Sequence, residues 1–302
     1  MKSNVKQSNR KAAFTIVELL TVMSIIVILI GLLVPALNKV RQFAYEVKQK
    51  AQFHSIDAAI ELFNSQFDDY PPSGALDSDN AHYCGAMKLC EAMMGRDLMG
   101  FHPDSTFRAS GLSSTGANLY PPQSDPTYQN SLSARKGPYL PLENANAYQL
   151  VDLYENTGPF AGDNFVLCDV FRRVIHRKSG QRVGMPILYY RANTANTLHD
   201  IDNPDNPQNI YNYQDNQELV MLGKPFDPPP NGTPHRLAID PTNPSKQGYR
   251  FYMNITNDKM LATTTAAVRP YREDTYILIS AGYDGEYGTP DDICNFEWKY
   301  RD

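Results

Sequence analysis

The first pattern along the chain is a long apolar run over residues 14–37, interrupted by one acidic side chain, Glu18. At about 1.5 Å per residue, a helix of this length measures about 36 Å, which exceeds the roughly 30 Å hydrocarbon core of a bilayer. Because basic flanks stay on the cytoplasmic side, we expect one transmembrane helix with its N-terminus inside and the rest of the chain outside. The leader before the run carries no acidic residue and four basic ones, Lys2, Lys6, Arg10 and Lys11.

From Asn38 to about Phe67 the chain keeps a helical pattern but adds a polar face. Neither glycine nor proline interrupts it until Pro71 and Pro72, which end a helix. The two parts together predict one helix of about 54 residues, about 80 Å long, whose second part packs against a sheet. Apolar side chains recur there every three or four residues, at Val40, Ala44, Val47, Ala51, Ile60, Phe63 and Phe67.

Residues 71–302 predict an α+β head with an insertion over about 73–250. A short helix is expected at 86–99, and loops rich in proline, asparagine and aspartate are expected at 203–209 and 226–234. The serine-, glycine- and proline-rich passage after the short helix leaves both an extended loop and a disordered segment open. Strands rich in β-branched or aromatic residues are expected at 165–171, 187–191, 249–254 and 276–280.

Glu18 is the unusual residue of the apolar run. An ionised side chain inside a membrane helix costs roughly 2.5 to 3.5 kcal/mol, so we expect this carboxylate to have a function. A secretory signal would have a shorter apolar core, of about 7 to 15 residues, followed by a small-residue cleavage site. A plain signal anchor is the simplest alternative, and it leaves Glu18 unexplained.

The start of the chain resembles the type IV pilins and the pseudopilins of type II secretion systems. The resemblance rests on the basic leader, the segment AFTIVELL at 13–20, and Pro35 inside the helix. Two later steps, DYP at 69–71 and GPYL at 137–140, are also similar to the pseudopilin pattern. The resemblance implies a leader over 1–13, a transmembrane assembly helix over 14–37, its amphipathic continuation over 38–70 and the head over 71–302.

The resemblance assigns roles to four residues. A prepilin peptidase is expected to cut between Ala13 and Phe14, after which the new amine of Phe14 is methylated; the family usually has glycine where Ala13 stands. Glu18 of one subunit is expected to accept the charged amine of a neighbour's Phe14, so that two buried charges compensate each other. Pro35 removes one helical N–H, and the resemblance implies local unwinding there when subunits enter a fibre.

A second candidate site follows the last predicted strand. The glycine-rich loop at 281–296 carries four carboxylates, and hard cations such as calcium bind six to eight carboxylate and carbonyl oxygens on flexible loops. An ordinary acidic turn remains the alternative. The loop resembles the ending of the major pseudopilins, which binds calcium, and this implies calcium as a cofactor. Carried over by position, Asp284 and Asp292 are the best ligand candidates, and Asp291 and Ser280 are weaker ones.

Four cysteines lie outside the apolar run. An oxidising compartment allows two disulfides among them, and spacing alone leaves the connectivity open. Pairs Cys84–Cys90 and Cys168–Cys294 are possible. Free, buried thiols are the alternative.

Charge and motifs narrow the function further. The formal net charge of −5 argues against binding nucleic acid, whose phosphates repel an acidic surface. The sequence has no zinc-protease, nucleophile-elbow or phosphate-loop motif, so we expect no enzyme. The densest basic cluster could touch an anionic polymer, but a solvated strand end is favoured; it consists of Arg172, Arg173, His176, Arg177 and Lys178.

Together these observations predict a filament subunit most like the major pseudopilin of a type II secretion system. The resemblance implies that it polymerises with itself to support protein export, and that its partners are prepilin peptidase, an inner-membrane assembly platform and other pseudopilins. We expect a single-pass protein of the inner membrane with a periplasmic head. Two alternatives stay open: a surface type IV pilin for adhesion, motility or DNA uptake, and a membrane-tethered periplasmic binding or enzymatic domain.

Overall fold

The structure is a computed structural model that describes residues 15–225, 232–239, 247–257 and 268–296. The chain divides into two compact units, residues 1–44 and 45–302, which are described separately below. The helices and strands, in chain order, are α1 (Ile16–Phe67), α2 (Gly85–Met94), α3 (Tyr128–Ala134), α4 (Leu142–Ala145), β1 (Ala147–Gln149), α5 (Leu150–Leu153), β2 (Phe165–Leu167), β3 (Val174–Ile175), β4 (Arg182–Val183), β5 (Leu188–Arg191), the 3-10 helix η1 (Tyr213–Asn216), α6 (Gln217–Met221), α7 (Tyr249–Ile255), β6 (Tyr276–Ser280) and β7 (Ile293–Cys294).

Helix α1 is continuous over 52 residues and includes Pro35. It ends where Asp68 adopts a left-handed backbone with φ of 55°, and the Asp68 amide still donates to the carbonyl of Asn64 at 2.8 Å. Pro71 and Pro72 follow at once and prevent the helix from resuming. The predicted long helix followed by small antiparallel sheets is therefore confirmed, and the fold class is α+β.

The prediction for the buried face of α1 is confirmed in part. Ile60 and Phe63 are buried and Phe67 packs partly buried beside them, whereas Val40, Ala44, Val47 and Ala51 are exposed. At about 100° per residue, the stripe through these four residues lies nearly opposite the buried side. The prediction was wrong for these four residues because apolar residues recur on both sides of the helix. The side chains that the head buries are Gln49, Gln52, Phe53, Ile56, Ala59, Ile60 and Phe63.

The head is organised around a three-stranded antiparallel sheet in the order β5-β6-β7. Tyr190 pairs with Ile277, and Ser280 pairs with Ile293. Every residue of the central strand β6 is buried, because both faces of the sheet are covered. Successive side chains of a strand point to opposite faces, so β6 contributes to two hydrophobic clusters.

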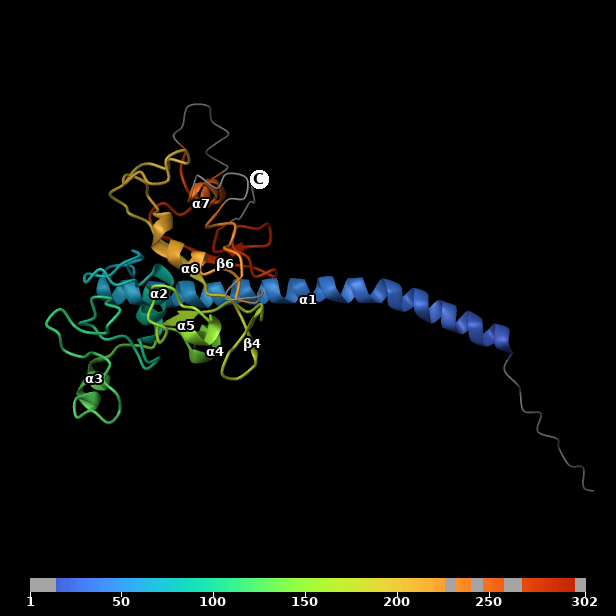
Figure 1. Ribbon diagram of the computed structural model, residues 1–302, viewed down its shortest axis with the longest axis horizontal. Coiled ribbons are helices and arrows are strands. Elements are labelled where there is room, and N and C mark those ends of the chain that lie inside the picture. The colour runs from blue at the N-terminus through green and yellow to red at the C-terminus, as the bar shows by residue number, and fades with distance from the viewer. Residues whose placement is uncertain (1–14, 226–231, 240–246, 258–267, 297–302) are drawn as a thin grey trace, which may run out of the picture. The chain divides into compact units, whose positions relative to one another are not determined.

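We name these clusters by what covers the sheet. The helix-side cluster includes Phe53, Ile56 and Ile60 of α1 together with Tyr276 and Leu278 of β6. The insertion-side cluster takes the alternate residues of β6 and packs them against α5, α6 and α7. Helix α2 and strand β6 lie beside the C-terminal part of α1 (Figure 1).

Helix α2 is buried along its entire length, including two charged residues. The Lys88 ammonium donates to the carbonyls of Gly74 and Leu76, at 2.6 and 2.9 Å. The Glu91 carboxylate accepts from three hydroxyl groups, those of Ser105 at 2.5 Å, Tyr83 at 2.6 Å and Tyr120 at 3.2 Å. Buried charges are tolerated only with such partners. Because α2 belongs to the insertion and is fully buried, the insertion carries part of the core of the head.

The remaining predicted elements have mixed outcomes. The helix expected at 86–99 is α2, which ends early because Gly95 adopts a left-handed backbone with φ of 78°. The strands expected at 187–191 and 276–280 are β5 and β6, and only Phe165–Leu167 of the strand expected at 165–171 forms. The loop expected at 226–234 lies mostly outside the described residues.

The strand expected at 249–254 is wrong, because this segment is helix α7. Its aromatic and β-branched residues favour a strand by propensity, but Phe251, Tyr252 and Ile255 follow helical spacing. On a helix these three side chains reach the insertion-side cluster together, so tertiary packing overrides the local preference.

Candidate functional site

The processing residues Ala13 and Phe14 lie outside the described residues, and Glu18 is in the first turn of α1. There the Glu18 carboxylate accepts from the Thr15 amide at 2.9 Å and from the Thr15 hydroxyl at 2.7 Å. The Glu18 amide donates in return to the Thr15 hydroxyl oxygen at 3.2 Å. This is a capping box, which satisfies amides that a helix start leaves without partners.

The capping box changes the interpretation of Glu18. The T-x-x-E signal was readable at 15–18, and sequence reasoning missed it. A plain signal anchor no longer leaves this carboxylate unexplained, since Glu18 has a local role in starting the helix. Any assembly role must therefore be separated experimentally from capping.

Pro35 lies inside α1, and the helix continues on both sides of it. Since proline has no N–H, the carbonyl of Gly31 loses its usual helical donor. A side chain at Gly31 would meet nothing within 4 Å, so this stretch has no packing partner in the described chain.

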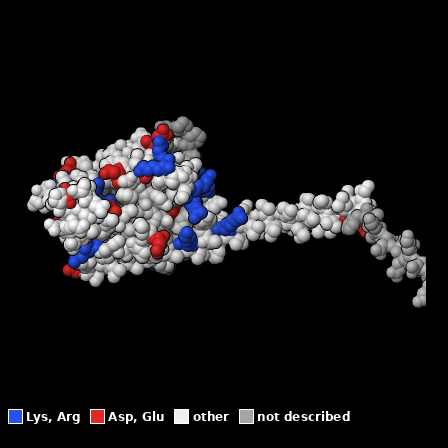
Figure 2. Space-filling view, turned by 90° about the horizontal axis from the view of Figure 1, so that it is seen from below, with Lys and Arg blue, Asp and Glu red and all other residues white. Residues whose placement is uncertain are grey.

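The apolar part of α1 is exposed on all sides. Its large apolar residues from Ile16 to Leu37 are between 43% and 83% exposed, and in Figure 2 the segment is white apart from its N-terminal end. By length and composition, α1 is able to cross a membrane. A helix that is apolar all round needs lipid or other helices to cover it, because water does not solvate such a surface favourably.

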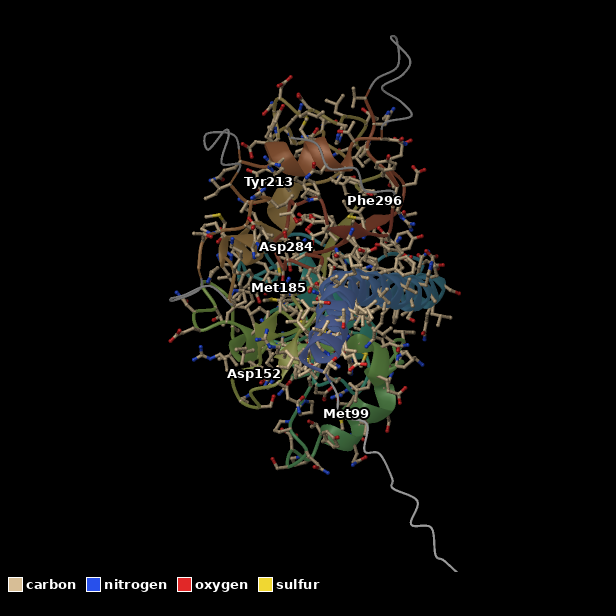
Figure 3. The ribbon with its side chains drawn as sticks, turned by 90° about the vertical axis from the view of Figure 1, so that its right-hand side faces the viewer. Met99, Asp152, Met185, Tyr213, Asp284 and Phe296 are labelled. Carbon is tan, nitrogen blue, oxygen red and sulfur yellow. The ribbon has the colours of Figure 1, made fainter. Side chains whose placement is uncertain are left out.

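The C-terminal acidic loop follows β6 and folds back on itself; Asp284 is labelled in Figure 3. The Asp284 amide donates to Asp291 Oδ2 at 2.8 Å, and the Gly288 amide donates to Asp292 Oδ2 at 2.7 Å. Gly282 has φ of 64°, and a Cβ there would collide with the carbonyl of Asp291, so glycine is required at this turn. The loop thus places the Asp284 amide on the Asp291 carboxylate and the Gly288 amide on the Asp292 carboxylate.

Among the described residues, no cation is paired with the carboxylates of Asp284, Asp291 and Asp292. Burial, with a smaller contribution from the neighbouring Asp291, raises the pKa of Asp284 to about 6. Burial also raises the pKa of Asp292 well above its usual value, with Asp284 and Asp291 adding to the effect. Asp292 Oδ1 is buried and has no hydrogen-bond partner within the part of the chain that the structure describes. The fourth carboxylate, Glu286, is paired with Lys224 and Arg236 at 3.2 and 3.5 Å.

This donor set fits a hard cation in part. Three acidic side chains with a buried orphan oxygen favour a positive ion, and the glycines allow carbonyls to turn toward it. Within the described ranges, however, no three His, Cys, Asp or Glu side chains are grouped closely enough to hold a metal alone. Ser280 is committed elsewhere: its hydroxyl donates to Asp169 Oδ2 at 2.8 Å. A calcium ion would therefore rest on Asp284, Asp291 and Asp292 with carbonyl oxygens.

The four cysteines, Cys84, Cys90, Cys168 and Cys294, are free and buried in the structure. Cys90 belongs to the helix-side cluster, and the other three belong to the insertion-side cluster. Burial raises the pKa of Cys84 to about 11, so its thiol stays protonated and acts as a small apolar group.

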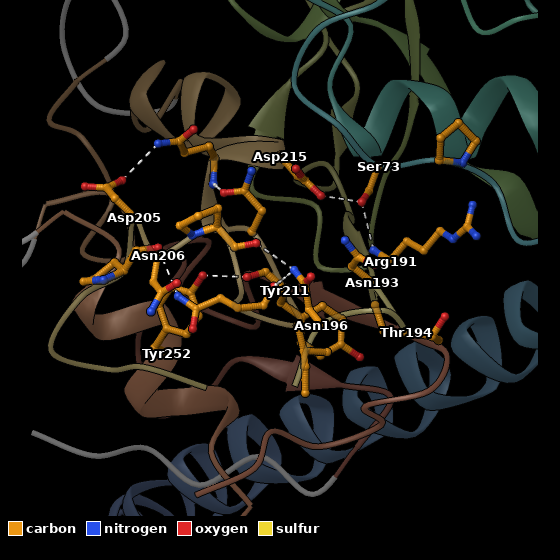
Figure 4. Close-up of a pocket in the computed structure, with 18 residues that line it drawn as sticks. Ser73, Arg191, Asn193, Thr194, Asn196, Asp205, Asn206, Tyr211, Asp215 and Tyr252 are labelled. Carbon is orange, nitrogen blue, oxygen red and sulfur yellow. Dashed lines mark hydrogen bonds between the residues drawn. The ribbon is translucent and has the colours of Figure 1, made fainter. Parts of the chain in front are cut away.

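A polar cavity of about 540 Å³ lies between β5, η1 and the loop at 203–209 (Figure 4). At its inner wall the Ser73 hydroxyl donates to the Asp215 carboxylate and accepts from the Arg191 amide at 3.0 Å. The Arg191 guanidinium donates a hydrogen bond to the Asp69 carboxylate at 2.9 Å. The sequence analysis did not identify these residues as a site. The only sequence feature near the cavity that stood out was the asparagine- and proline-rich loop at 203–209.

Comparisons of the chain with known protein families, with curated proteins and with solved structures gave no match.

Proposed function

We propose that the chain is a prepilin-type filament subunit that polymerises through α1, as a pseudopilin of a type II secretion-like system does. The observation that carries this proposal is the N-terminal half of α1, which is apolar on every side and has no covering partner in the described chain. Lipid covers such a surface before assembly, and the same surfaces of neighbouring subunits cover it in a fibre.

The exposed side of α1 within the head supports this proposal. Val47 and Leu62 are 51% and 58% exposed, and Ala51 and Ala58 are exposed between them. These four residues lie on the side of the helix away from the head core. A helix that packs only against its own head does not need an apolar stripe on its outer side, whereas a helix in a bundle does.

In this proposal a prepilin peptidase removes residues 1–13, and the exposed amine of Phe14 is methylated. The Glu18 carboxylate of one subunit then accepts the charged amine of its neighbour and sets the stagger between subunits. The subunit is inserted in the inner membrane with its head in the periplasm. Its partners are further copies, an assembly platform and other pseudopilins that act in protein export.

Substitution of Glu18 tests the proposal, because the capping box and the intersubunit ion pair have different requirements. Glu18→Gln keeps an acceptor for the Thr15 amide but removes the charge, whereas Glu18→Ala removes both. We expect both variants to lose filaments in an assay of sheared or pelleted polymer, while Thr15→Val, which removes the capping hydroxyl, retains them. Normal polymer from Glu18→Gln would contradict the charge-pairing mechanism.

We also propose that the C-terminal loop binds calcium through Asp284, Asp291 and Asp292. The uncompensated carboxylates and the orphan Asp292 Oδ1 support this site. A bound cation would neutralise the loop and fix the end of the sheet where β7 begins.

A plain membrane tether for a periplasmic domain is the second candidate. The capping box favours it, because Glu18 then needs no partner in another subunit. Mass spectrometry of the mature N-terminus separates the two candidates. Methylated Phe14 is expected for the filament subunit, and an intact leader is expected for the tether.

A further inference from the structure

A second cavity, of about 370 Å³, lies in the head where α1, the segment before β3 and strand β4 meet. Each of these three parts contributes one cation: Lys48 from α1, Arg172 from the segment before β3 and Arg182 from β4. Residues far apart in the sequence thus bring three positive charges to one cavity. A cleft lined by charges of one sign concentrates ions of the opposite sign.

Arg172 differs from the other members of the basic cluster. Arg173 lies over the Tyr283 ring, with 4.5 Å between the guanidinium carbon and the ring centroid. His176 and Lys178 pair with Asp152, and Arg177 pairs with Glu155. Arg172 instead lines the cavity. The basic residues that are neighbours in the sequence therefore have different surroundings in the folded head.

None of the three cavity cations forms an ion pair with a carboxylate in the part of the chain that the structure describes. The one acid of the lining, Asp169, is 2% exposed. Its Oδ1 accepts from the amides of Phe171 and Met185, both at 3.1 Å, and its Oδ2 accepts from Ser280. The carboxylate of Asp169 is therefore committed to the core.

One backbone feature marks the same place. Arg172 lines the cavity with φ of 52°, whereas the left-handed backbone of Asn146, with φ of 43°, is explained by its position as the C-cap of α4. A left-handed backbone costs a residue with a side chain roughly 1 to 2 kcal/mol, and such outliers gather at binding sites. Asn146 and Tyr148 also line the cavity, and their side chains carry neutral hydrogen-bond donors.

We propose that this cavity binds a phosphate group, supplied either by free phosphate or by the headgroup of an anionic lipid. Lys48, Arg172 and Arg182 provide the charge, and guanidinium groups donate in pairs to phosphate oxygens. Asn146 and Tyr148 donate to the phosphate oxygens that the three cations do not bind. The site lies wholly within the head and does not depend on polymerisation.

Phosphate titration of the full chain in a neutral detergent tests the site, with binding followed by calorimetry and by the melting temperature of the head. We expect wild-type protein to bind inorganic phosphate, with weaker binding as sodium chloride is added. The double variant Arg172→Asn, Arg182→Gln should bind at least about tenfold more weakly, since each residue loses a charge-assisted bond. Asparagine is chosen at 172 because it tolerates the left-handed backbone.

The matched control is the double variant Lys50→Gln, Lys136→Gln, which removes two exposed cations outside the cavity and should bind as wild type does. Near-ultraviolet circular dichroism of both variants verifies that the head is folded.

The second arm compares the full chain in nanodiscs of neutral lipid and of lipid containing phosphatidylglycerol. A higher melting temperature in the anionic lipid, lost in Arg172→Asn, Arg182→Gln, would identify the headgroup as the source. No response of the wild type to either phosphate or anionic lipid would overturn the proposal, as would equal responses of the two double variants. Because both arms use unassembled protein, a failure of filament formation leaves these results unaffected.

Discussion

The two halves of α1 share one backbone and differ in what stabilises them. Between Ile16 and Leu37 the large apolar side chains are exposed, whereas Ile56 and Ile60 are completely buried. The second half is held by the core of its own head, and its contribution can be measured on a single molecule. The first half contributes free energy only through lipid or other chains.

The comparison shows that apolar side chains have different roles in the two halves of one helix. An apolar side chain of the first half marks a surface that another molecule must cover. In the second half, the same residue type on the buried side is part of the fold, and on the outer side it again marks a possible contact. Substitutions can break the comparison at each of these places.

The largest effect is expected from the core side of α1. Ile56→Ala removes a fully buried side chain from the helix-side cluster and should lower the free energy of unfolding by about 2 to 5 kcal/mol. Ile28→Ala, in the exposed half, should leave unfolding of the head unchanged. Urea unfolding in detergent, followed by tyrosine signals of the head, measures both. Equal losses would mean that the two halves are stabilised in the same way.

A pH effect of roughly 3 kcal/mol at most is expected from Asp215. Burial raises the pKa of Asp215 to about 6 in the folded head, from 3.8. The folded state therefore holds this proton more tightly than the unfolded chain. This contribution to stability is complete below about pH 4 and is lost as the pH rises through about 6.

Asp215→Asn keeps an acceptor for the Ser73 hydroxyl and should flatten the pH dependence of unfolding between about pH 4 and 6. Asp163→Asn, which changes an exposed carboxylate, serves as the control. An unchanged slope in Asp215→Asn would show that the buried proton does not contribute.

Calcium should stabilise the head by about 2.7 kcal/mol at a free concentration one hundred times its dissociation constant. Asp292→Asn should remove this response, and without calcium it should be at least as stable as wild type near pH 7 because a buried charge is lost. Glu286→Gln should keep the calcium response, since this carboxylate already pairs with Lys224 and Arg236. Thermal melts with calcium or chelator measure all three, and a wild type indifferent to calcium would eliminate the site.

The smallest effect on stability is expected on the outer side of α1. Leu62→Ser changes a side chain that is 58% exposed, so the free energy of unfolding should shift by no more than about 0.5 kcal/mol. Polymer yield should nevertheless fall, because the stripe with Val47, Ala51 and Ala58 becomes polar. Normal assembly of this variant would leave the first half of α1 as the sole contact surface.

Much of the helix and the central sheet was predictable from the sequence, and the reasons are local. A long apolar run and an uninterrupted helical pattern up to Pro71 fixed the extent of α1, and strand β6 was a continuous run of β-branched and apolar residues. The buried face of α1 and the identity of α7 depend on contacts made by residues far away in the chain. Such contacts leave no local signal, so propensity gave the wrong answer at 249–254.

The candidate sites divide in the same way. The acidic loop was predictable because Asp284, Asp291 and Asp292 are close in sequence. The capping box at Thr15 and Glu18 is equally local. It was missed because the Glu18 carboxylate had been assigned to an ion pair with a neighbouring subunit. The basic cavity was not predictable, since Lys48 and Arg182 meet only after the head has folded.

The late position of β6 has a consequence for biosynthesis. This strand separates the two halves of the core, yet among the described elements it is translated after every helix and after β1 to β5, and its partner β7 comes later still. A nascent chain halted before Tyr276 would already possess all of α1 but could close neither side of the sheet. Both hydrophobic clusters therefore stay incomplete until β6 has been synthesised, long after α1 is finished.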